Sequence, residues 1–187
     1  MRRPLLELVH ELGLTLDEFS PGYVTDPKKA VYSIYRDVRF SNDKSLYKTH
    51  VAAVFAYRGP EKHAGAGYYF HFSADELLVG GEVYAPGSPE LLKIRQQIAA
   101  DPDELRGIVG NRTFKRHFNG IEGEKLKRIP KGFPPDHSAA DLLVYKQFLA
   151  GAKLPASELE SPHIARTIHK HLKAVAPFIQ YLNRALA

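Results

Sequence analysis

Apolar positions change their spacing along the chain, from a helical repeat near the N-terminus to strand-like runs in the centre and helical repeats afterwards. Leucine and valine recur at helical spacing over residues 4–13, and Gly13 suits a C-cap, so a short helix is predicted there. Short connections between the central runs favour antiparallel pairing, because a parallel return needs a crossover of about a dozen residues. Gly80-Gly81 indicates a bulge or a close backbone approach. Strands are predicted at residues 30–35, 51–57, 68–73 and 77–84.

Helix-start signals dominate the sequence after residue 84. The helix that begins near residue 138 is predicted to carry Phe148, and Pro177 is predicted to kink the last helix or to start a separate one. Strands followed by helices predict an α+β fold, an antiparallel sheet with helices packed mainly on one face and a helical C-terminal half. Without a repeat or linker, residues 1–187 are expected to form a single globular domain. Starts of helices are indicated at Ser88, Asp101, Ser138 and Ser161.

The composition excludes several classes of site and location. The 187 residues contain no cysteine, which rules out a disulfide framework, a thiol nucleophile and thiolate metal sites. The histidines show no metal-binding spacing, and we expect neither a metal nor another cofactor. No apolar run approaches the ~18 residues of a membrane helix, and the N-terminus lacks a signal-peptide core. We therefore expect a cytoplasmic protein without membrane contact, and no pattern specifies its oligomeric state.

A basic segment between residues 112 and 131 carries the whole excess charge of the chain. It holds seven basic residues and two glutamates, and seven minus two equals the formal net charge of +5. Such a patch attracts phosphate, nucleic acid or an acidic protein, although a solvated surface without a partner has the same composition. The basic residues are Arg112, Lys115, Arg116, Lys125, Lys127, Arg128 and Lys131.

Charged residues also gather from residue 34 to residue 50, between two apolar stretches. In an extended chain Arg36 shares a face with Ile34 and Val38, so at least one arginine is expected to point toward a core or a cleft. A guanidinium placed there demands a carboxylate or an anionic ligand, and it suits planar recognition of carboxylate or phosphate. The polar residues of this segment include Arg36, Asp37, Arg39, Asp43, Lys44, Tyr47 and Lys48.

Three interpretations of this segment stay open. In the first, Asp37 and Asp43 neutralise the cations in a purely structural network. In the second, the arginines and Lys44 bind an anionic ligand. In the third, one of the aspartates is an acid–base catalyst. The third is the weakest, because adjacent cations keep a carboxylate ionised and make it a poor acid.

A second group of candidate residues precedes the helix predicted at Ser138. It comprises Lys131, Asp136 and His137, with Lys146 further along the chain. A helix N-terminus is a natural anion site, and a histidine there can bind an anion or relay a proton. Asp136 is equally suited to cap the helix, which is the commoner role of an aspartate at that place.

Familiar catalytic and nucleotide-binding motifs are absent from the sequence. It contains no Walker loop, dinucleotide fingerprint or nucleophile elbow. The aromatic run at residues 68–72 could stack nucleic-acid bases. Alternating aromatics in a strand more often form a core face and a solvated face, and no RRM-like pattern accompanies them.

The run from Ile34 to His50 resembles the signature of a bacterial and fungal family, the domain of unknown function 2461. The resemblance covers nearly the whole chain, and it implies no catalytic residue because the family has no established activity. Further matches lie at Tyr68-Tyr69-Phe70, Gly80-Gly81, Pro130-Lys131-Gly132-Phe133 and Asp136-His137. The signature reads Arg-Asp-x-Arg-Phe, then Asp or Asn before Lys, then Tyr, and it matches Arg36, Asp37, Arg39, Phe40, Asp43, Lys44 and Tyr47.

Four positions depart from the family pattern, and the chain is expected to begin inside it. Ser33 stands where a further arginine is usual, and Glu82 stands in place of a third glycine. Leu46 and Ser138 stand where proline is usual. An N-terminal segment rich in Asn-Asn and Trp-Phe is expected from the family and does not occur here.

The leading hypothesis is a domain that binds a phosphate- or carboxylate-bearing ligand at an Arg/Lys/Tyr/His cluster. The alternative is a non-catalytic module that docks nucleic acid or an acidic partner on the basic segment, without a recognised nucleic-acid motif. Enzymatic activity is neither indicated nor excluded. The predicted ligand-binding residues are Arg36, Asp37, Arg39, Asp43, Lys44, Tyr47, Lys131, Asp136, His137 and Lys146.

Overall fold

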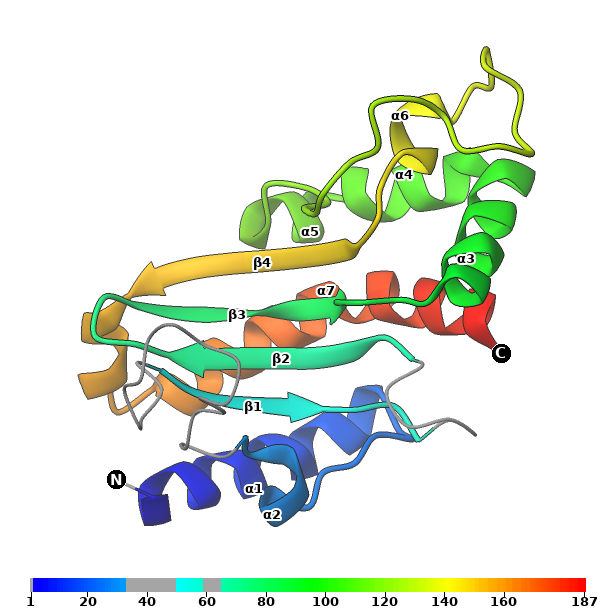
Figure 1. Cartoon of the computed structure of the whole chain (residues 1–187). Coiled ribbons are helices and arrows are strands. Elements are labelled where there is room, and N and C mark those ends of the chain that lie inside the picture. The colour runs from blue at the N-terminus through cyan, green and yellow to red at the C-terminus, as the bar shows by residue number, and fades with distance from the viewer. Residues whose placement is uncertain (1, 33–49, 59–64) are drawn as a thin grey trace, which may run out of the picture.

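A four-stranded sheet forms the centre of the molecule (Figure 1). A computed structural model describes residues 2–32, 50–58 and 65–187 of the chain. Its strands are β1 (Val51–Phe55), β2 (Gly67–Phe72), β3 (Glu76–Val83) and β4 (Phe148–Pro155). Its helices are α1 (Arg2–Phe19), α2 (Pro27–Ala30), α3 (Ser88–Ala100), α4 (Pro102–Gly110), α5 (Arg112–His117), α6 (Ala140–Leu143), the 3-10 helix η1 (Ala156–Glu160) and α7 (Ile164–Leu186). None of the helices in these residues is long and apolar enough to cross a membrane.

The four strands pair antiparallel in chain order, β1-β2-β3-β4. Ser73 holds the tight turn between β2 and β3, because its hydroxyl accepts hydrogen bonds from the backbone N–H groups of Asp75 and Glu76. The register then places Tyr69 opposite Gly80, and Gly80 opposite Gly151. The antiparallel sheet is confirmed, as are the three strands predicted between residues 51 and 84.

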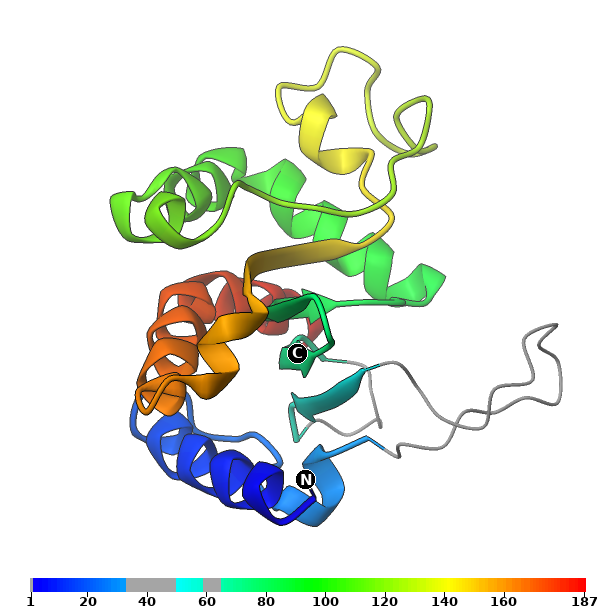
Figure 2. The same ribbon diagram turned by 90° about the vertical axis from the view of Figure 1, so that its left-hand side faces the viewer.

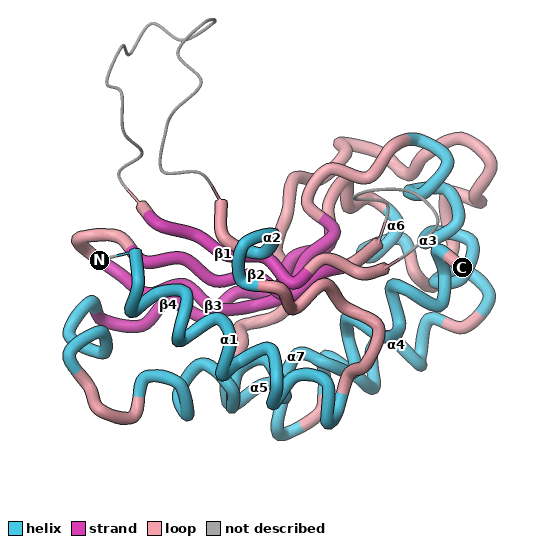
Figure 3. Tube along the Cα trace, turned by 90° about the horizontal axis from the view of Figure 1, so that it is seen from below, coloured by secondary structure: helices cyan, strands magenta, loops and turns pink. Residues whose placement is uncertain are grey.

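Helices α1 and α7 lie on the same face of the sheet (Figures 2 and 3). Helix α7 runs along β3 and also packs against α1, although the two helices come from opposite ends of the chain. Helices α4, α5 and α6 lie beyond the β4 edge of the sheet (Figure 1). The predicted α+β class, with helices mainly on one face, is therefore confirmed.

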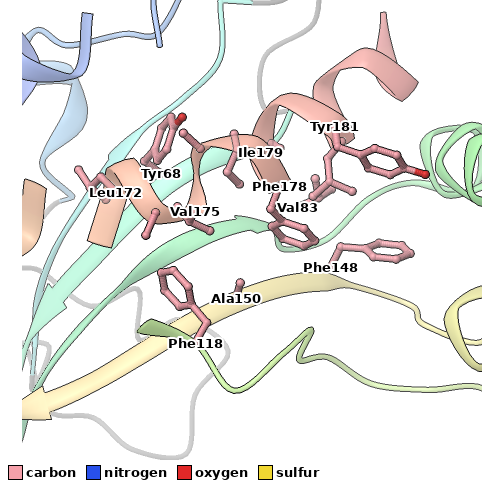
Figure 4. Packing of buried hydrophobic residues seen from close by; sticks show 14 of the residues in the cluster. Tyr68, Val83, Phe118, Phe148, Ala150, Leu172, Val175, Phe178, Ile179 and Tyr181 are labelled. Carbon is pink, nitrogen blue, oxygen red and sulfur yellow. The ribbon is translucent and has the colours of Figure 1, made fainter. Parts of the chain in front are cut away.

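The hydrophobic core fills the space between the sheet and α7 (Figure 4). Phe70, Phe148 and Phe178 are completely buried there. Gly81 lets the helix approach the strand, because a Cβ atom built at this position would clash with the side chain of Ile179. The glycine pair thus marks a close approach, and the regular register shows that it is not a bulge.

A buried hydrogen-bond cluster ties α7 to β2 and to the loop after α1. The Asn183 amide group donates to the Tyr23 hydroxyl at 2.8 Å and to the Ala66 carbonyl at 3.0 Å. Its carbonyl oxygen accepts from the Ala66 N–H at 2.7 Å. Nearby, the Tyr68 hydroxyl donates to Ser20 Oγ at 2.8 Å. These bonds satisfy polar groups whose burial would otherwise be penalised.

Two predictions near the N-terminus are wrong. Helix α1 continues well past Gly13, where a Cβ atom would lie 2.9 Å from Thr25 Cβ, so this glycine permits close packing and does not end the helix. The strand predicted from residue 30 fails at Ala30, which is the last residue of α2. Val31 makes only an isolated bridge to β1, and the residues after Tyr32 in that prediction lie outside the described part.

The helix predicted to carry Phe148 is also wrong. Helix α6 is a single turn, and Phe148 begins β4. This strand lacks the β-branched residues that usually mark one, so its pairing with β3, and not its local preference, gives it its structure. Helix α7 continues through Pro177, and a separate final helix does not form.

Candidate functional site

The sheet face turned away from α1 and α7, called the outer face here, carries mainly small and polar residues, with Val54, Leu78 and Leu149 among them. Side chains alternate between the two faces along each strand, so Tyr69 and His71 lie on the outer face while Tyr68 and Phe70 lie in the core. Gly80 and Gly151, which pair across β3 and β4 in the middle of this face, leave the strand backbone uncovered by side chains. Strand pairing aligns the outer residues in three rows, Ala52–His71–Leu78–Lys153, Val54–Tyr69–Gly80–Gly151 and Gly67–Glu82–Leu149.

A pocket of about 450 Å³, called the outer-face pocket, lies over these glycines. Its volume is typical of sites for small molecules. At Gly151 a Cβ atom would be 3.9 Å from its nearest neighbour, the Leu78 side chain, so the missing side chain leaves open space in the pocket floor. At Gly80 the Ala150 carbonyl fills that space instead. The polar side chains of the lining are those of Tyr32, His50, Tyr69, His71, Glu82, Tyr84 and Glu122.

Glu82 places a carboxyl group on the wall of this pocket. Its side chain is half-buried on β3, and burial raises its pKa from 4.5 to about 7. None of the ion pairs among the described residues includes Glu82. A carboxyl group in a pocket with a strongly shifted pKa is more typical of a functional site than of a surface residue.

Tyrosine hydroxyls from three parts of the chain accompany Glu82 in the pocket. Burial raises the pKa of Tyr69 to about 12, and the negative charge of Glu82 adds to this shift. Burial also raises the pKa of Tyr32, again with Glu82 contributing. The hydroxyls of Tyr69 and Tyr32 therefore stay protonated at neutral pH and can donate hydrogen bonds. Tyr84, the residue after β3, supplies an exposed ring at the rim.

A chain of polar contacts crosses the outer face from Tyr69 to Lys153. The Tyr69 hydroxyl lies 3.2 Å from His71 Nδ1, and His71 Nε2 lies 3.7 Å from Glu76 Oε1. Lys153 Nζ pairs with Glu76 Oε2 at 3.3 Å. Burial lowers the pKa of His71, and His50, whose ring centroid is 5.1 Å away, lowers it further. A neutral imidazole is therefore expected at pH 7.

The charged signature segment lies outside the described residues. This applies to six of the predicted ligand-binding residues, Arg36, Asp37, Arg39, Asp43, Lys44 and Tyr47. The described residues on either side of that gap in the chain are Tyr32 and His50, and both line the outer-face pocket. The segment is therefore joined at both of its ends to residues of the pocket.

The other four predicted residues are described and do not line the pocket. His137 Nδ1 accepts a hydrogen bond at 3.0 Å from the backbone N–H two residues later, which is a local turn contact before α6. Lys146 forms an ion pair with Glu124 at 3.0 Å. Lys131 and Asp136 are exposed. No hydrogen bond or ion pair between described residues joins one of these four side chains to another.

The basic side chains of the segment at residues 112–131 lie on the surface, while Phe114 and Phe118 between them are buried in the core. All seven of its lysine and arginine side chains are exposed, on α5 and on the connection from α5 to α6. Lys125 Nζ lies 4.3 Å from the centre of the Tyr145 ring. Among the described contacts none of the seven forms an ion pair. The patch is therefore available to solvent along its whole length.

A second hollow of about 810 Å³ lies between α4, α5 and α7. Its wall includes Glu104, which is already paired with Arg184. His117 is also on the wall, and burial lowers its pKa, with His171 adding to the shift. No three potential metal ligands come together at either hollow or elsewhere in residues 2–32, 50–58 and 65–187. The outer-face pocket is the stronger candidate, because its half-buried carboxyl group, that of Glu82, has no ion-pair partner among the described residues.

Glu82, Tyr69 and Gly151 are pocket residues to which the sequence assigned no role in a ligand site, although Tyr69 lies in a family match and Glu82 departs from the family pattern. The available signal is the period-two alternation of β2 and β3, which puts Tyr69 on the face opposite Phe70. Alternation does not reveal which face the helices cover. The sequence could not place Gly151 on the sheet, because β4 has no strand signal of its own.

One family model matches the chain. It is described as a conserved hypothetical protein (DUF2461), and the match covers residues 1–181. No curated protein and no solved structure matches the chain.

Proposed function

We propose that this chain, which belongs to the DUF2461 family, binds a small organic ligand in the outer-face pocket. The observation that carries the proposal is Glu82, a half-buried carboxyl group without an ion-pair partner among the described residues. Placing a charged or polar group in such surroundings lowers stability unless another group compensates for it. A bound ligand that contacts Glu82 supplies that compensation.

The floor of the pocket suits a flat ligand. The backbone is bare over Gly80 and Gly151, while Tyr69, Leu78 and Leu149 stand around it on the same face. A planar group can therefore lie on the peptide planes and contact apolar walls at its edges. The tyrosine hydroxyls and Glu82 then provide the few oriented polar contacts that give such sites their specificity.

A negative charge on the ligand is inferred from the amino-acid sequence. Arg36, Arg39 and Lys44 lie in the chain between Tyr32 and His50, which both line the pocket. Guanidinium groups suit phosphate and carboxylate, and lysine adds a further positive charge. We therefore propose that the ligand bears a phosphate or a carboxylate group.

A thermal-shift screen of metabolites tests this function. A ligand present at 100 times its dissociation constant adds about 2.7 kcal/mol of stability, which is readily detected. Genuine hits are lost in Gly151→Leu, because the new side chain enters the pocket floor. The control is Gly110→Leu, which adds the same side chain where a Cβ atom meets nothing within 4 Å. Arg36→Ala and Arg39→Ala test the anionic group. A hit that survives Gly151→Leu does not bind in this pocket, and a screen without hits contradicts the proposal.

A second candidate function rests on the basic segment. Seven exposed cations without ion-pair partners in the described structure suit a nucleic-acid backbone or an acidic protein. Fluorescence anisotropy with a short DNA, a short RNA and polyglutamate tests it. Binding that weakens steeply with salt, and that is reduced in Lys127→Glu/Arg128→Glu, supports this function. Equal binding by wild type and variant contradicts it.

A further inference from the structure

We infer that the wall of the outer-face pocket formed by Glu82 and the tyrosines binds a protonated amine group of the ligand. The inference rests on the proposed function and narrows its ligand class.

The described lining supplies negative charge and no permanent positive charge. It includes the carboxyl groups of Glu82 and Glu122 and contains no lysine or arginine. Its His71 has a lowered pKa and is neutral at pH 7. This part of the pocket therefore attracts a positive group.

Tyrosine rings strengthen this preference. Tyr69 stands diagonally across from Glu82, since Tyr69 pairs with Gly80 and Glu82 is two positions further along the same strand. Tyr32 and Tyr84 line the pocket as well. The faces of aromatic rings attract cations, and they do so more strongly where water is excluded. A carboxyl group beside several tyrosine rings is a suitable receptor for an ammonium group.

The protonation of Glu82 gives this inference a distinctive pH dependence. Its pKa of about 7 reflects burial without a counter-charge, so a cation bound beside it favours the ionised form and releases the proton. An anion bound there favours the protonated form and takes a proton up. Amine binding therefore tightens as the pH rises through 7, and anion binding weakens. The other titratable groups that line the pocket are Tyr32, Tyr69, Tyr84, His50, His71 and Glu122.

Three probes with the same ring separate the alternatives, namely benzylamine, benzyl alcohol and benzoate. Each is titrated into ¹⁵N-labelled protein at pH 6 and pH 8, and the amide signals of Gly80 and Gly151 report binding in the pocket. We expect benzylamine to bind more tightly than benzyl alcohol. Its affinity should rise about tenfold between the two pH values, in proportion to the ionised fraction of a group with a pKa near 7. Benzylamine itself stays charged at both.

Glu82→Gln is the decisive variant, because it keeps the size of the side chain and removes its charge. It should abolish both the preference for benzylamine and the pH dependence. Glu160→Gln, which removes an exposed carboxyl group on η1 outside the pocket, should leave the preference and the pH dependence in place. Equal affinity for benzylamine and benzyl alcohol, or an unchanged pH dependence in Glu82→Gln, overturns the inference alone. If none of the probes moves the Gly80 and Gly151 signals and the metabolite screen has no hits, the proposed function itself fails.

Discussion

The two faces of the sheet are formed by the same strands but differ in their surroundings. One packs against α7, and the other lines the outer-face pocket. On the core face, Phe70 and Val79 are completely buried under α7. On the outer face their chain neighbours are Tyr69, which carries a hydroxyl group, and Gly80, which has no side chain. Neighbouring residues of one strand therefore differ in which side chains they tolerate. On the core face the choice is restricted by packing against α7, and on the outer face it is restricted by the shape of the pocket.

Under the proposed function, this difference separates the residues that stabilise the fold from those that contact the ligand within single strands. Substitutions on the core face are expected to change the free energy of unfolding and to leave a ligand's contacts intact. Substitutions on the outer face are expected to change binding with little loss of stability, and removal of the charge of Glu82 is expected to increase stability above pH 7. Four predictions follow the comparison from its largest effect to its smallest.

Phe70→Ala should lower the free energy of unfolding by about 3–5 kcal/mol, because it leaves a cavity in a well-packed core. The ring of Phe70 lies 5.6 Å from that of Phe72 and 6.2 Å from that of Phe55, measured between centroids, and both contacts are lost. Its neighbour Tyr69→Phe removes only a hydroxyl group and should cost about 1 kcal/mol or less. Urea denaturation of the two variants measures the difference, and similar losses in both would show that the faces are not distinct.

Glu82→Gln should change how stability depends on pH. The folded pKa of about 7 lies above the unfolded value of 4.5, so the folded state holds a proton that the unfolded state releases between these values. The contribution of Glu82 is therefore fully present below pH 4.5 and is lost as the pH rises through 7. At pH 8 the wild type bears the full cost of ionising the group, and Glu82→Gln should be more stable by up to about 3 kcal/mol.

Denaturation of wild type and Glu82→Gln at pH 5 and pH 8 measures this linkage. The stability difference between the two proteins should change in favour of the variant as the pH rises. Glu122→Gln serves as the control, because its carboxyl group is exposed and its removal should not alter the trend. A difference that stays constant between pH 5 and pH 8 means that Glu82 titrates normally.

Gly81→Ala and Gly151→Ala place the same methyl group on opposite faces. At Gly81 the methyl group clashes with Ile179 on α7, and such overpacking typically costs about 1–3 kcal/mol. At Gly151 it meets the Leu78 side chain at 3.9 Å, an ordinary contact, so stability should stay within about 1 kcal/mol of wild type. Thermal denaturation compares the two, and a larger loss at Gly151 would mean that the outer face is packed as tightly as the core.

Local patterns account for much of the fold. Asp101 caps α4 by accepting hydrogen bonds from the N–H groups of Asp103 and Glu104, as the Asp-Pro start signal predicts. β4 could not be predicted in this way, because its residues have little strand preference. It forms because β3 offers a partner at which Gly80 and Gly151 pass closely, and such a contact between distant parts of the chain leaves no local signal.

The candidate site is harder to predict than the strands that form it. Alternation shows that Tyr69 and His71 share a face, but it does not show that α7 takes the other face. The raised pKa of Glu82 depends on burial, and its register neighbour Leu149 comes from β4, which lies far along the chain. The sequence marks the charged segment from residue 34 to residue 50, most of which lies outside the described residues. The predicted role of that segment therefore rests on the sequence, and the pocket rests on the structure.

The smallest effect concerns the charges at the far end of the outer face. Lys153 pairs with Glu76 at 3.3 Å, but 70% of the lysine side chain is exposed, so Lys153→Met should cost only about 0.2–1 kcal/mol. High salt should erase most of that difference.

The positive charge of Lys153 also lowers the pKa of His71. Removal of this charge should raise that pKa, and an NMR titration of the imidazole measures the change. Lys173→Met on α7 is the matched control and should leave the His71 titration unchanged. If Lys153→Met instead destabilises the protein as much as Gly81→Ala does, the charges of the outer face stabilise the fold. The proposed difference between the core face and the outer face of the sheet is then wrong.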